Sequence, residues 1–338
     1  MNIKPLLSDI ELELQKQIAR LDVPRTKVFQ EMLTYHMGWT GEGAGPEATG
    51  KRIRPLMVLL SAAATAPLST NESWRSALPA AAAVELVHNF SLVHDDIQDH
   101  SDKRRGRPTT WVKWGAPMAI NAGDALFVLS NQAIIDLKEN YPAEIVLRAA
   151  EILHNTCLEL TRGQFLDMSY EKRDDLMVED YWPMISGKTA ALLSACCHIG
   201  SLLGGADDSK QEAYRSFGHY LGLAFQVQDD ILGIWGDEAV TGKSAANDLT
   251  EGKKSLPVLV GLTAKGRFEA RWKQGPIQST EVQELARLLA SEGGYEAAID
   301  AAKQMTDLAL MSLREADPLG EAGQALFELA DRLLKRNQ

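Results

Sequence analysis

The chain has 338 residues, of which 45% are hydrophobic and 24% charged, and its formal net charge is −11. This is ordinary globular composition with ample length for a large core. The acidic balance excludes the global basic surface of a general nucleic-acid-binding protein, so we expect no nucleic acid partner. The three cysteines, Cys157, Cys196 and Cys197, show neither a disulfide framework nor zinc-ligand spacing, which indicates a reducing cytoplasm.

Helical patterns follow one another along the whole chain. The N-terminus is charged and amphipathic with no signal-peptide core, and we find no run of about 18 apolar residues that would predict a membrane span. The predicted helices are 8–36, 56–66, 79–100, 117–139, 143–170, 188–203, 210–236 and 255–264, with two or three more over 281–335. Strand-type alternation with turn dipeptides is absent from the sequence. We therefore predict one all-α domain over 1–338, a single large helical bundle around a central cavity.

The helix that starts at Pro79 ends in an acidic motif, Asp95-Asp96-Ile97-Gln98-Asp99. Leu92 follows His88 by four residues, Asp95 and Asp96 follow Leu92 by three and four, and Asp99 follows Asp95 and Asp96 by four and three, so they share one helix face. Carboxylates at this end repel one another, and the helix dipole disfavours each by roughly 0.3–1 kcal/mol. A hard divalent cation such as Mg²⁺ would compensate. The alternative is a solvated acidic helix end.

A second acidic pair lies on the helix predicted over 210–236. Gln226, Asp229, Asp230 and Gly233 share one face there, whereas the other face is apolar. A charged pair inside an apolar helix is costly unless it is paired or bound to metal, and a salt-bridged core pair is the alternative for one such site. Two acidic sites that face across a cavity would together hold several Mg²⁺ ions and, through them, a polyphosphate.

Basic residues occur in groups, several of them next to glycine, which permits close backbone approach to a ligand. Arginine offers a bidentate fork for phosphate and lysine a mobile point charge. Taken singly, each could be ordinary solvated charge; together they suggest two phosphate subsites. The groups are Lys51, Arg52 and Arg54; Lys103, Arg104, Arg105 and Arg107; Lys188; Lys243; and Lys253 with Lys254.

An ordered series of motifs carries a family resemblance. The series comprises residues 50–55 (GKRIRP), 88–99, 104–106, 163–167, 187–189 and 225–230, then Gly242-Lys243 with Asp248 and Lys253. In this order the chain resembles the trans-isoprenyl diphosphate synthases of the polyprenyl synthetase family. The resemblance implies the isoprenoid synthase fold and a head-to-tail condensation of isopentenyl diphosphate with an allylic diphosphate (dimethylallyl, geranyl or farnesyl).

The resemblance also implies roles for individual residues. It implies three Mg²⁺ ions, with Mn²⁺ as an alternative metal. The implied metal-binding residues are Asp95, Asp96, Asp99, Asp167, Asp229 and Asp230, of which Asp96, Asp167 and Asp230 act as support or through water. The implied residues around the allylic diphosphate are Arg104, Lys188, Lys243 and Lys253, and those around isopentenyl diphosphate are Lys51, Arg54, His88 and Arg105. Oxygens of Lys188, Thr189 and Gln226 would lie near the carbocation.

The product and the assembly are also expectations from the resemblance. Phe90, Ser91 and Val87 lie just before the first acidic motif, where family members limit the growing chain, and they resemble the geranylgeranyl-producing class. Farnesyl or farnesylgeranyl diphosphate is the alternative product. Gly233 stands where the family's second motif has its last Asp, which keeps open a terpene cyclase-like enzyme or a non-catalytic modulatory subunit. An acidic scaffold without activity is a further alternative. We expect a homodimer, with the apolar stretch 116–129 as a candidate interface.

Overall fold

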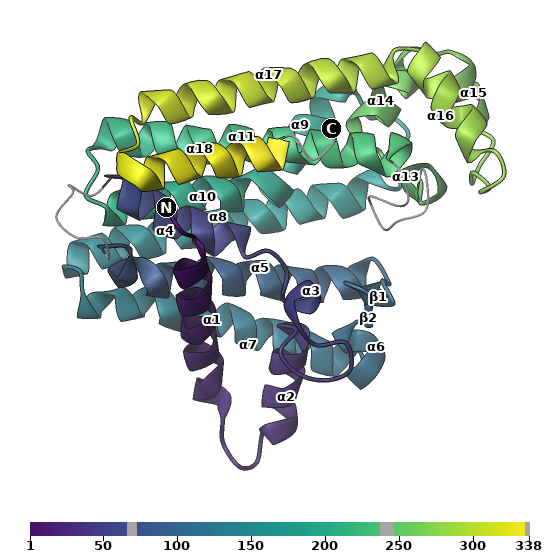
Figure 1. Ribbon diagram of the computed structural model, residues 1–338. Coiled ribbons are helices and arrows are strands. Elements are labelled where there is room, and N and C mark those ends of the chain that lie inside the picture. The colour runs from purple at the N-terminus through teal and green to yellow at the C-terminus, as the bar shows by residue number, and fades with distance from the viewer. Residues whose placement is uncertain (66–72, 237–246, 335–338) are drawn as a thin grey trace. The chain divides into compact units, whose positions relative to one another are not determined.

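The structure is a computed structural model that describes residues 1–65, 73–236 and 247–334 (Figure 1). The chain forms two compact units. Unit 1 consists of Met1–His154, Cys196–Gln211 and Pro318–Ala325, and unit 2 consists of Asn155–Ala195, Glu212–Asp317 and Leu326–Gln338. Each unit is described by itself below. The single domain over 1–338 stays a prediction.

Unit 1 is almost entirely helical. Its elements are α1 (Lys4–Ile18), η1 (Ala19–Leu21), α2 (Lys27–His36), α3 (Pro46–Thr49), α4 (Ile53–Thr65), η2 (Ser73–Ala77), α5 (Leu78–Gln98), β1 (Lys103–Arg104), β2 (Arg107–Pro108), α6 (Thr110–Trp114), α7 (Ala116–Ile135) and η3 (Asp136–Glu139). Four helices contribute residues to both units: α8 (Ala143–Tyr170), α10 (Ala191–Leu203), α11 (Asp208–Trp235) and α18 (Gly320–Leu334).

Unit 2 contains the remaining helices. They are α9 (Val178–Ile185), the π-helical turn η4 (Ser186–Ala190), α13 (Asn247–Thr250), α14 (Leu256–Thr263), α15 (Arg267–Trp272), α16 (Val282–Ser291) and α17 (Gly294–Glu315). In Figure 1, α15 and α16 lie at one end of the long helix α17. Buried side chains of α9, α11, α14 and α17 form one hydrophobic cluster of this unit. The prediction of an all-α chain is confirmed.

Helix α5 is the core of unit 1. It packs against α7, α4 and α1, and Ala80–Ala83 are fully buried. Proline at the first turn and a run of alanines favour this helix, and the small side chains let its neighbours approach closely. The end of α5 carries the first acidic motif, so the motif is attached to a core helix of the unit.

Two departures from the predicted elements have local causes. The helix expected over 8–36 is broken into α1 and α2, because Pro24 lacks a backbone N–H and disfavours the helical conformation at Val23. Strands β1 and β2 form a short antiparallel hairpin that was not predicted. Its two turn residues, Arg105 and Gly106, both have positive φ (+52° and +73°), as a type I′ turn requires.

Two helical stretches of the described chain are long and apolar enough to span a membrane by length and composition alone: Trp74–Gln98 and Ala116–Glu139. Neither stretch was expected from the sequence to span a membrane. The first is 72% buried over its apolar window and is the core helix of unit 1; the second is 44% buried.

Candidate active site

The first acidic motif divides into one buried and two accessible carboxylates. Asp96 is 2% exposed, whereas Asp95 is 21% exposed and Asp99 is an exposed residue at the helix end. Asp95 and Asp99 are one turn apart, so both can approach the same ligand. Asp96 lies on the protein side of the motif.

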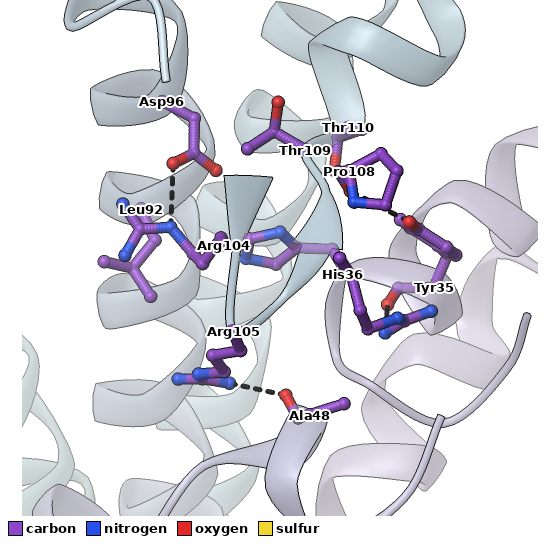
Figure 2. A pocket seen from close by; sticks show the side chains of 11 residues that line it. Tyr35, His36, Ala48, Leu92, Asp96, Arg104, Arg105, Pro108, Thr109 and Thr110 are labelled. Atoms are coloured by element: carbon purple, nitrogen blue, oxygen red, sulfur yellow. Dashed lines mark hydrogen bonds and ion pairs between the residues drawn. The ribbon is translucent and has the colours of Figure 1, made fainter. Parts of the chain in front are cut away.

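The β1–β2 hairpin delivers Arg104 to this motif. Its Nε donates to Asp96 Oδ1 at 2.8 Å (Figure 2), and its Nη2 lies 3.6 Å from Asp95 Oδ2. Burial raises the pKa of Asp96 to about 6, against the opposing effect of Arg104. Arg104 therefore holds the buried carboxylate of Asp96. This contact favours a positioning role for Asp96 beside the accessible carboxylates of Asp95 and Asp99.

A cationic cluster lies beside the motif in unit 1. Arg54 is partly buried as a residue, its buried Nε has no hydrogen-bond partner within the described chain, and burial lowers the pKa of the guanidinium. His88 also has its pKa lowered well below 6.5, first by burial and then by Arg54 and Arg105. A partly buried guanidinium whose Nε lacks an acceptor is suited to an anion. Lys51, the fourth residue expected at this site, is exposed.

Arg105 closes the cluster from the hairpin turn. Its Nη1 donates to the Ala48 carbonyl at 2.8 Å (Figure 2). Gly50 has a φ of +78°, which favours glycine, and a β-carbon there would stand 2.6 Å from Arg105 Nη2. The glycine that opens the GKRIRP motif thereby brings the loop before α4 and the hairpin turn together.

Arg52, in the same motif, has a structural role. Its side chain is 2% exposed, and its φ is +48°. Its Nε donates to Glu11 at 2.6 Å and its Nη1 donates to Glu85 at 2.8 Å. Arg107 is likewise structural, because it donates to the carbonyls of Glu42, Tyr35 and Thr40. These two arginines belong to the basic groups of the sequence, but they bind acceptors within the protein and are not assigned to a ligand.

In unit 2 a backbone crossing brings Asp167 and Lys188 together. A β-carbon on Gly163 of α8 would lie 2.0 Å from the Lys188 nitrogen, and one on Gly187 would lie 2.5 Å from the Glu159 carbonyl oxygen. The main chains of these two helical segments touch there, at the two glycines. Lys188 lies in the π-helical turn, a form often found at functional sites. Its Nζ forms an ion pair with Asp167.

A hydrogen-bond network surrounds the second acidic motif. Thr189 Oγ1 donates to Gln226 Oε1 at 2.7 Å, and Gln226 Nε2 donates to Asp230 Oδ1 at 3.0 Å. Tyr181 donates its hydroxyl to Asp230 Oδ2 at 2.7 Å. Asp230 is 6% exposed, and burial raises its pKa to about 7 in spite of these donors. Asp229, the first residue of the pair, is exposed.

Both acidic motifs thus share one design. In each, the second aspartate is buried and held by protein donors, whereas the first remains accessible. Each accessible set supplies oxygen donors, the ligand type of Mg²⁺, which usually keeps water and substrate oxygens in its shell. Over the described ranges, no three His, Cys, Asp or Glu side chains gather closely enough to hold a metal without such help. The donor chemistry fits a metal shared with a phosphate ligand.

Asp248 occupies the space beside Gly233. A β-carbon on Gly233 would lie 2.1 Å from Asp248 Oδ2. Lys253 pairs with Asp248 at 3.4 Å and with Glu251 at 2.9 Å. Burial disfavours the charge on Lys253, but these carboxylates outweigh it and raise its pKa. Lys243, which was expected to bind the allylic diphosphate, lies outside the described residues.

The three predicted chain-length residues differ in burial. Val87 is fully buried, whereas Phe90 and Ser91 are partly exposed. The Phe90 ring lies 5.1 Å from the Phe127 ring of α7 and 5.5 Å from the His94 ring, measured between centroids. Phe90 and Ser91 can therefore meet a ligand more readily than Val87 can.

Sequence reasoning missed residues that act on this machinery from a distance. Glu11, Glu85, Tyr181 and His36 carried no motif signal, because their roles depend on contacts across long sequence separations. Asp248 was part of a matched motif but received no role. The only available hint was Gly233, whose missing side chain marks a close approach.

Comparisons with known proteins agree with this arrangement. Residues 45–289 match the family model described as Polyprenyl synthetase. The chain is 39% identical over 292 residues to a geranylgeranyl diphosphate synthase of Mycobacterium tuberculosis, a match that covers 84% of this chain and 81% of that protein. It is 42% identical over 246 residues to a (2E,6E)-farnesyl diphosphate synthase of Mycobacterium bovis, covering 71% of this chain and 66% of that protein.

A solved structure is similar as well. The crystal structure of a geranylgeranyl pyrophosphate synthetase from Pyrococcus horikoshii matches with a TM-score of 0.88 and 33% identity, over 99% of this chain and 97% of that one. The family model spans most of the chain and includes both acidic motifs and the cationic cluster. The chain therefore belongs to the polyprenyl synthetase family and has its isoprenoid synthase fold.

Proposed function

We propose that the protein is a Mg²⁺-dependent trans-prenyltransferase that condenses isopentenyl diphosphate with allylic diphosphates and releases geranylgeranyl diphosphate. The observation that carries the proposal is the shared design of the two acidic motifs, together with the cationic cluster of unit 1. A scaffold would not need buried carboxylates anchored behind accessible ones, because burial of each carboxylate costs free energy.

The reaction joins two substrates of different reactivity. The allylic C–O bond breaks and leaves diphosphate and a carbocation. The double bond of isopentenyl diphosphate attacks that cation, a new C–C bond forms, and a proton leaves to restore a double bond. The released diphosphate accepts the proton, so the chain needs no dedicated side-chain base. When bound, Mg²⁺ neutralises charge on the diphosphate and makes it a better leaving group.

The residues of unit 2 support the ionisation step. Lys188 and Lys253 supply positive charge for the leaving diphosphate. Gln226 is fixed by its bond to Asp230, so its amide oxygen stays turned toward Thr189. Oxygen dipoles held in this way stabilise a developing cation without reorganising. We assign Asp95, Asp99 and Asp229 as metal ligands, and Asp96 and Asp230 as their supports.

The residues of unit 1 bind the second diphosphate. Arg54, Arg105, His88 and Lys51 form the site for isopentenyl diphosphate, and Arg104 adds to the allylic site. The C–O bond of this substrate does not break in the reaction, so direct contacts from basic side chains to its diphosphate suffice. The pairing of a cationic site with a metal-binding acidic site distinguishes a condensing enzyme from a terpene cyclase, which takes a single diphosphate.

We also propose a homodimer formed through α7. Met118, Ile120, Val128 and Ile135 of this helix are between 43% and 55% exposed, an unusual share for an apolar helix of 20 residues. We expect the protein to act in the cytoplasm.

The test is incubation of purified protein with MgCl₂, isopentenyl diphosphate and each allylic primer, followed by product sizing. The expected product is geranylgeranyl diphosphate with stoichiometric release of inorganic diphosphate. Farnesyl diphosphate as the end product would support the alternative that the Mycobacterium bovis relative suggests. A protein that released no diphosphate with any primer would be a scaffold or a modulatory subunit, contrary to the proposal.

A further inference from the structure

A small pocket lies between the β1–β2 hairpin, the end of α2 and the acidic motif of α5. Its walls include His36, Asp96, Arg104 and Thr110. Figure 2 shows the His36 ring beside Arg104, between the Asp96 carboxylate and Tyr35. The space open to the centre of a water molecule is about 20 Å³, which is room for roughly one water.

Three polar atoms on these walls are buried and have no hydrogen-bond partner among the residues that the structure describes. They are His36 Nε2, Asp96 Oδ2 and Thr110 Oγ1. Buried polar atoms without partners are rare, and three around one small space indicate a common partner. Each of the three belongs to a different element: α2, α5 and α6.

The chemistry of these atoms specifies that partner. Asp96 Oδ1 accepts from Arg104, and in the ionised carboxylate that pairs with this guanidinium Oδ2 can only accept. His36 forms a hydrogen bond with the backbone of Asn89. Since Nε2 is the nitrogen without a partner, this bond comes from Nδ1, and Nε2 of the neutral ring is also an acceptor. Thr110 has a hydroxyl proton to give.

The occupant must therefore donate two hydrogen bonds and accept one. An anion is excluded, because a phosphate or sulfate oxygen would face the free oxygen of Asp96. We propose that a single ordered water binds here, donating to Asp96 Oδ2 and His36 Nε2 and accepting from Thr110 Oγ1, and that His36 and Thr110 thereby position Arg104.

The link to Arg104 runs through the carboxylate. Oδ1 of Asp96 holds Arg104 Nε at 2.8 Å, and the water fixes the other oxygen. A carboxylate bonded on both oxygens cannot rotate about its terminal torsion, so the guanidinium keeps one direction. His36 and Thr110 are positioning residues that act through the water and Asp96.

The first experiment is a crystal structure of the unliganded protein, grown without sulfate or phosphate, at a resolution that defines water. The expected result is one water peak within about 3.2 Å of Asp96 Oδ2, His36 Nε2 and Thr110 Oγ1. Absence of such a peak, or a peak that fails to contact any one of the three atoms, overturns the proposal. This arm does not depend on the proposed function.

The second experiment is kinetic and rests on the proposed function. Thr110→Val keeps the shape and removes the hydroxyl, whereas Thr110→Ser keeps the hydroxyl. We expect Thr110→Val to raise KM for the allylic diphosphate about 2- to 10-fold, the range for one lost hydrogen bond, and Thr110→Ser to stay within about twofold of wild type. His36→Leu and His36→Gln form a second pair with the same expected order, since Gln can offer a polar atom near Nε2.

Equal KM values for Thr110→Val and Thr110→Ser, in proteins with wild-type circular dichroism, would overturn the positioning role. Should the valine variant fail to fold, the His36 pair decides the kinetic arm. A wild-type protein with the water in place but without prenyltransferase activity would refute the proposed function alone.

Discussion

The carboxylate of Asp248 lies where a side chain on Gly233 would begin, because a β-carbon there would be 2.1 Å from Oδ2 and 2.5 Å from Cγ. Gly233 is the position at which the sequence departs from the family's second acidic motif. In this chain that position is filled from outside the helix by Asp248, which is itself buried.

Restoring the family's aspartate at Gly233 should therefore harm the protein. We expect Gly233→Asp and Gly233→Ala to lower the free energy of unfolding by about 1–3 kcal/mol, the usual range for overpacking. Urea denaturation measures this. In the double variant Gly233→Ala/Asp248→Ala the clash is gone, so the two effects should be less than additive. Full additivity would contradict the steric explanation.

Arg52 should be the most sensitive charge of unit 1. Its guanidinium is buried between Glu11 and Glu85, and loss of the Glu85 charge leaves it paired with the partly exposed Glu11 alone. We expect Glu85→Gln to lower the free energy of unfolding by about 1.5–3 kcal/mol, the range for a hydrogen bond to a charged group. Glu212→Gln, which breaks an exposed pair with Arg215, is the matched control and should cost less than about 1 kcal/mol. Similar losses for the two variants would argue against this ranking.

His36 should make stability fall in acid. Burial, with help from Arg104 and Arg105, lowers its pKa from 6.5 to about 3. Between these values the unfolded chain binds a proton that the folded protein does not. The contribution is therefore fully present above pH 6.5 and is lost as the pH falls toward 3, by up to about 1.4 kcal/mol per pH unit.

The check is the free energy of unfolding of His36→Gln between pH 7 and pH 4. This variant should lose less stability across the range than wild type, because glutamine does not titrate. His100→Gln changes an exposed histidine and should follow the wild-type curve. A His36→Gln slope as steep as that of wild type would refute the prediction.

Much of the fold could be predicted from the sequence, because long helices leave a periodic signal. The limits of α8 were predicted residue for residue, and α5 and α11 to within about two, the usual error at helix ends. The break between α1 and α2 was missed because apolar residues recur at helical spacing on both sides of Pro24. The hairpin was missed because its strands have two residues each, too few for alternation.

The candidate site was predictable in its residue types but not in its division of labour. Asp95 and Asp96 are identical neighbours in the sequence, yet one is accessible and the other buried against Arg104. That difference follows from the rotation of α5 against its neighbours, which no single-sequence pattern records. The same holds for Asp229 and Asp230.

Phe90 should limit product length if it meets the growing chain. Its partly exposed ring packs on Phe127. Phe90→Ala removes this ring and opens space beside Phe127, while the backbone of α5 stays helical. We expect longer prenyl diphosphates from Phe90→Ala and shorter ones from Ser91→Phe, as measured by chromatography of the hydrolysed products. Val58→Ala, at a fully buried position of α4, is the control and should leave product length unchanged. An unaltered product from both Phe90→Ala and Ser91→Phe would contradict the role of these two residues in limiting product length.

Helix α7 should control assembly. Val128 is a 55% exposed apolar side chain of α7, so Val128→Asp should shift the protein from dimer to monomer in light scattering coupled to size-exclusion chromatography. Leu12→Asp, at a 61% exposed leucine of α1, should leave the mass unchanged. A Val128→Asp protein with wild-type mass would place any interface elsewhere.

The contact between Gly163 and Gly187 means that two helical segments meet main chain to main chain. Asp167 follows Gly163 by one turn and Lys188 adjoins Gly187, so their separation is inherited from the backbone rather than from side-chain choice. Side chains around the site can therefore be exchanged while this main-chain contact keeps Asp167 and Lys188 at the same separation. Loss or gain of a single residue within 186–190 would swing everything beyond it by about 100° around the helix axis.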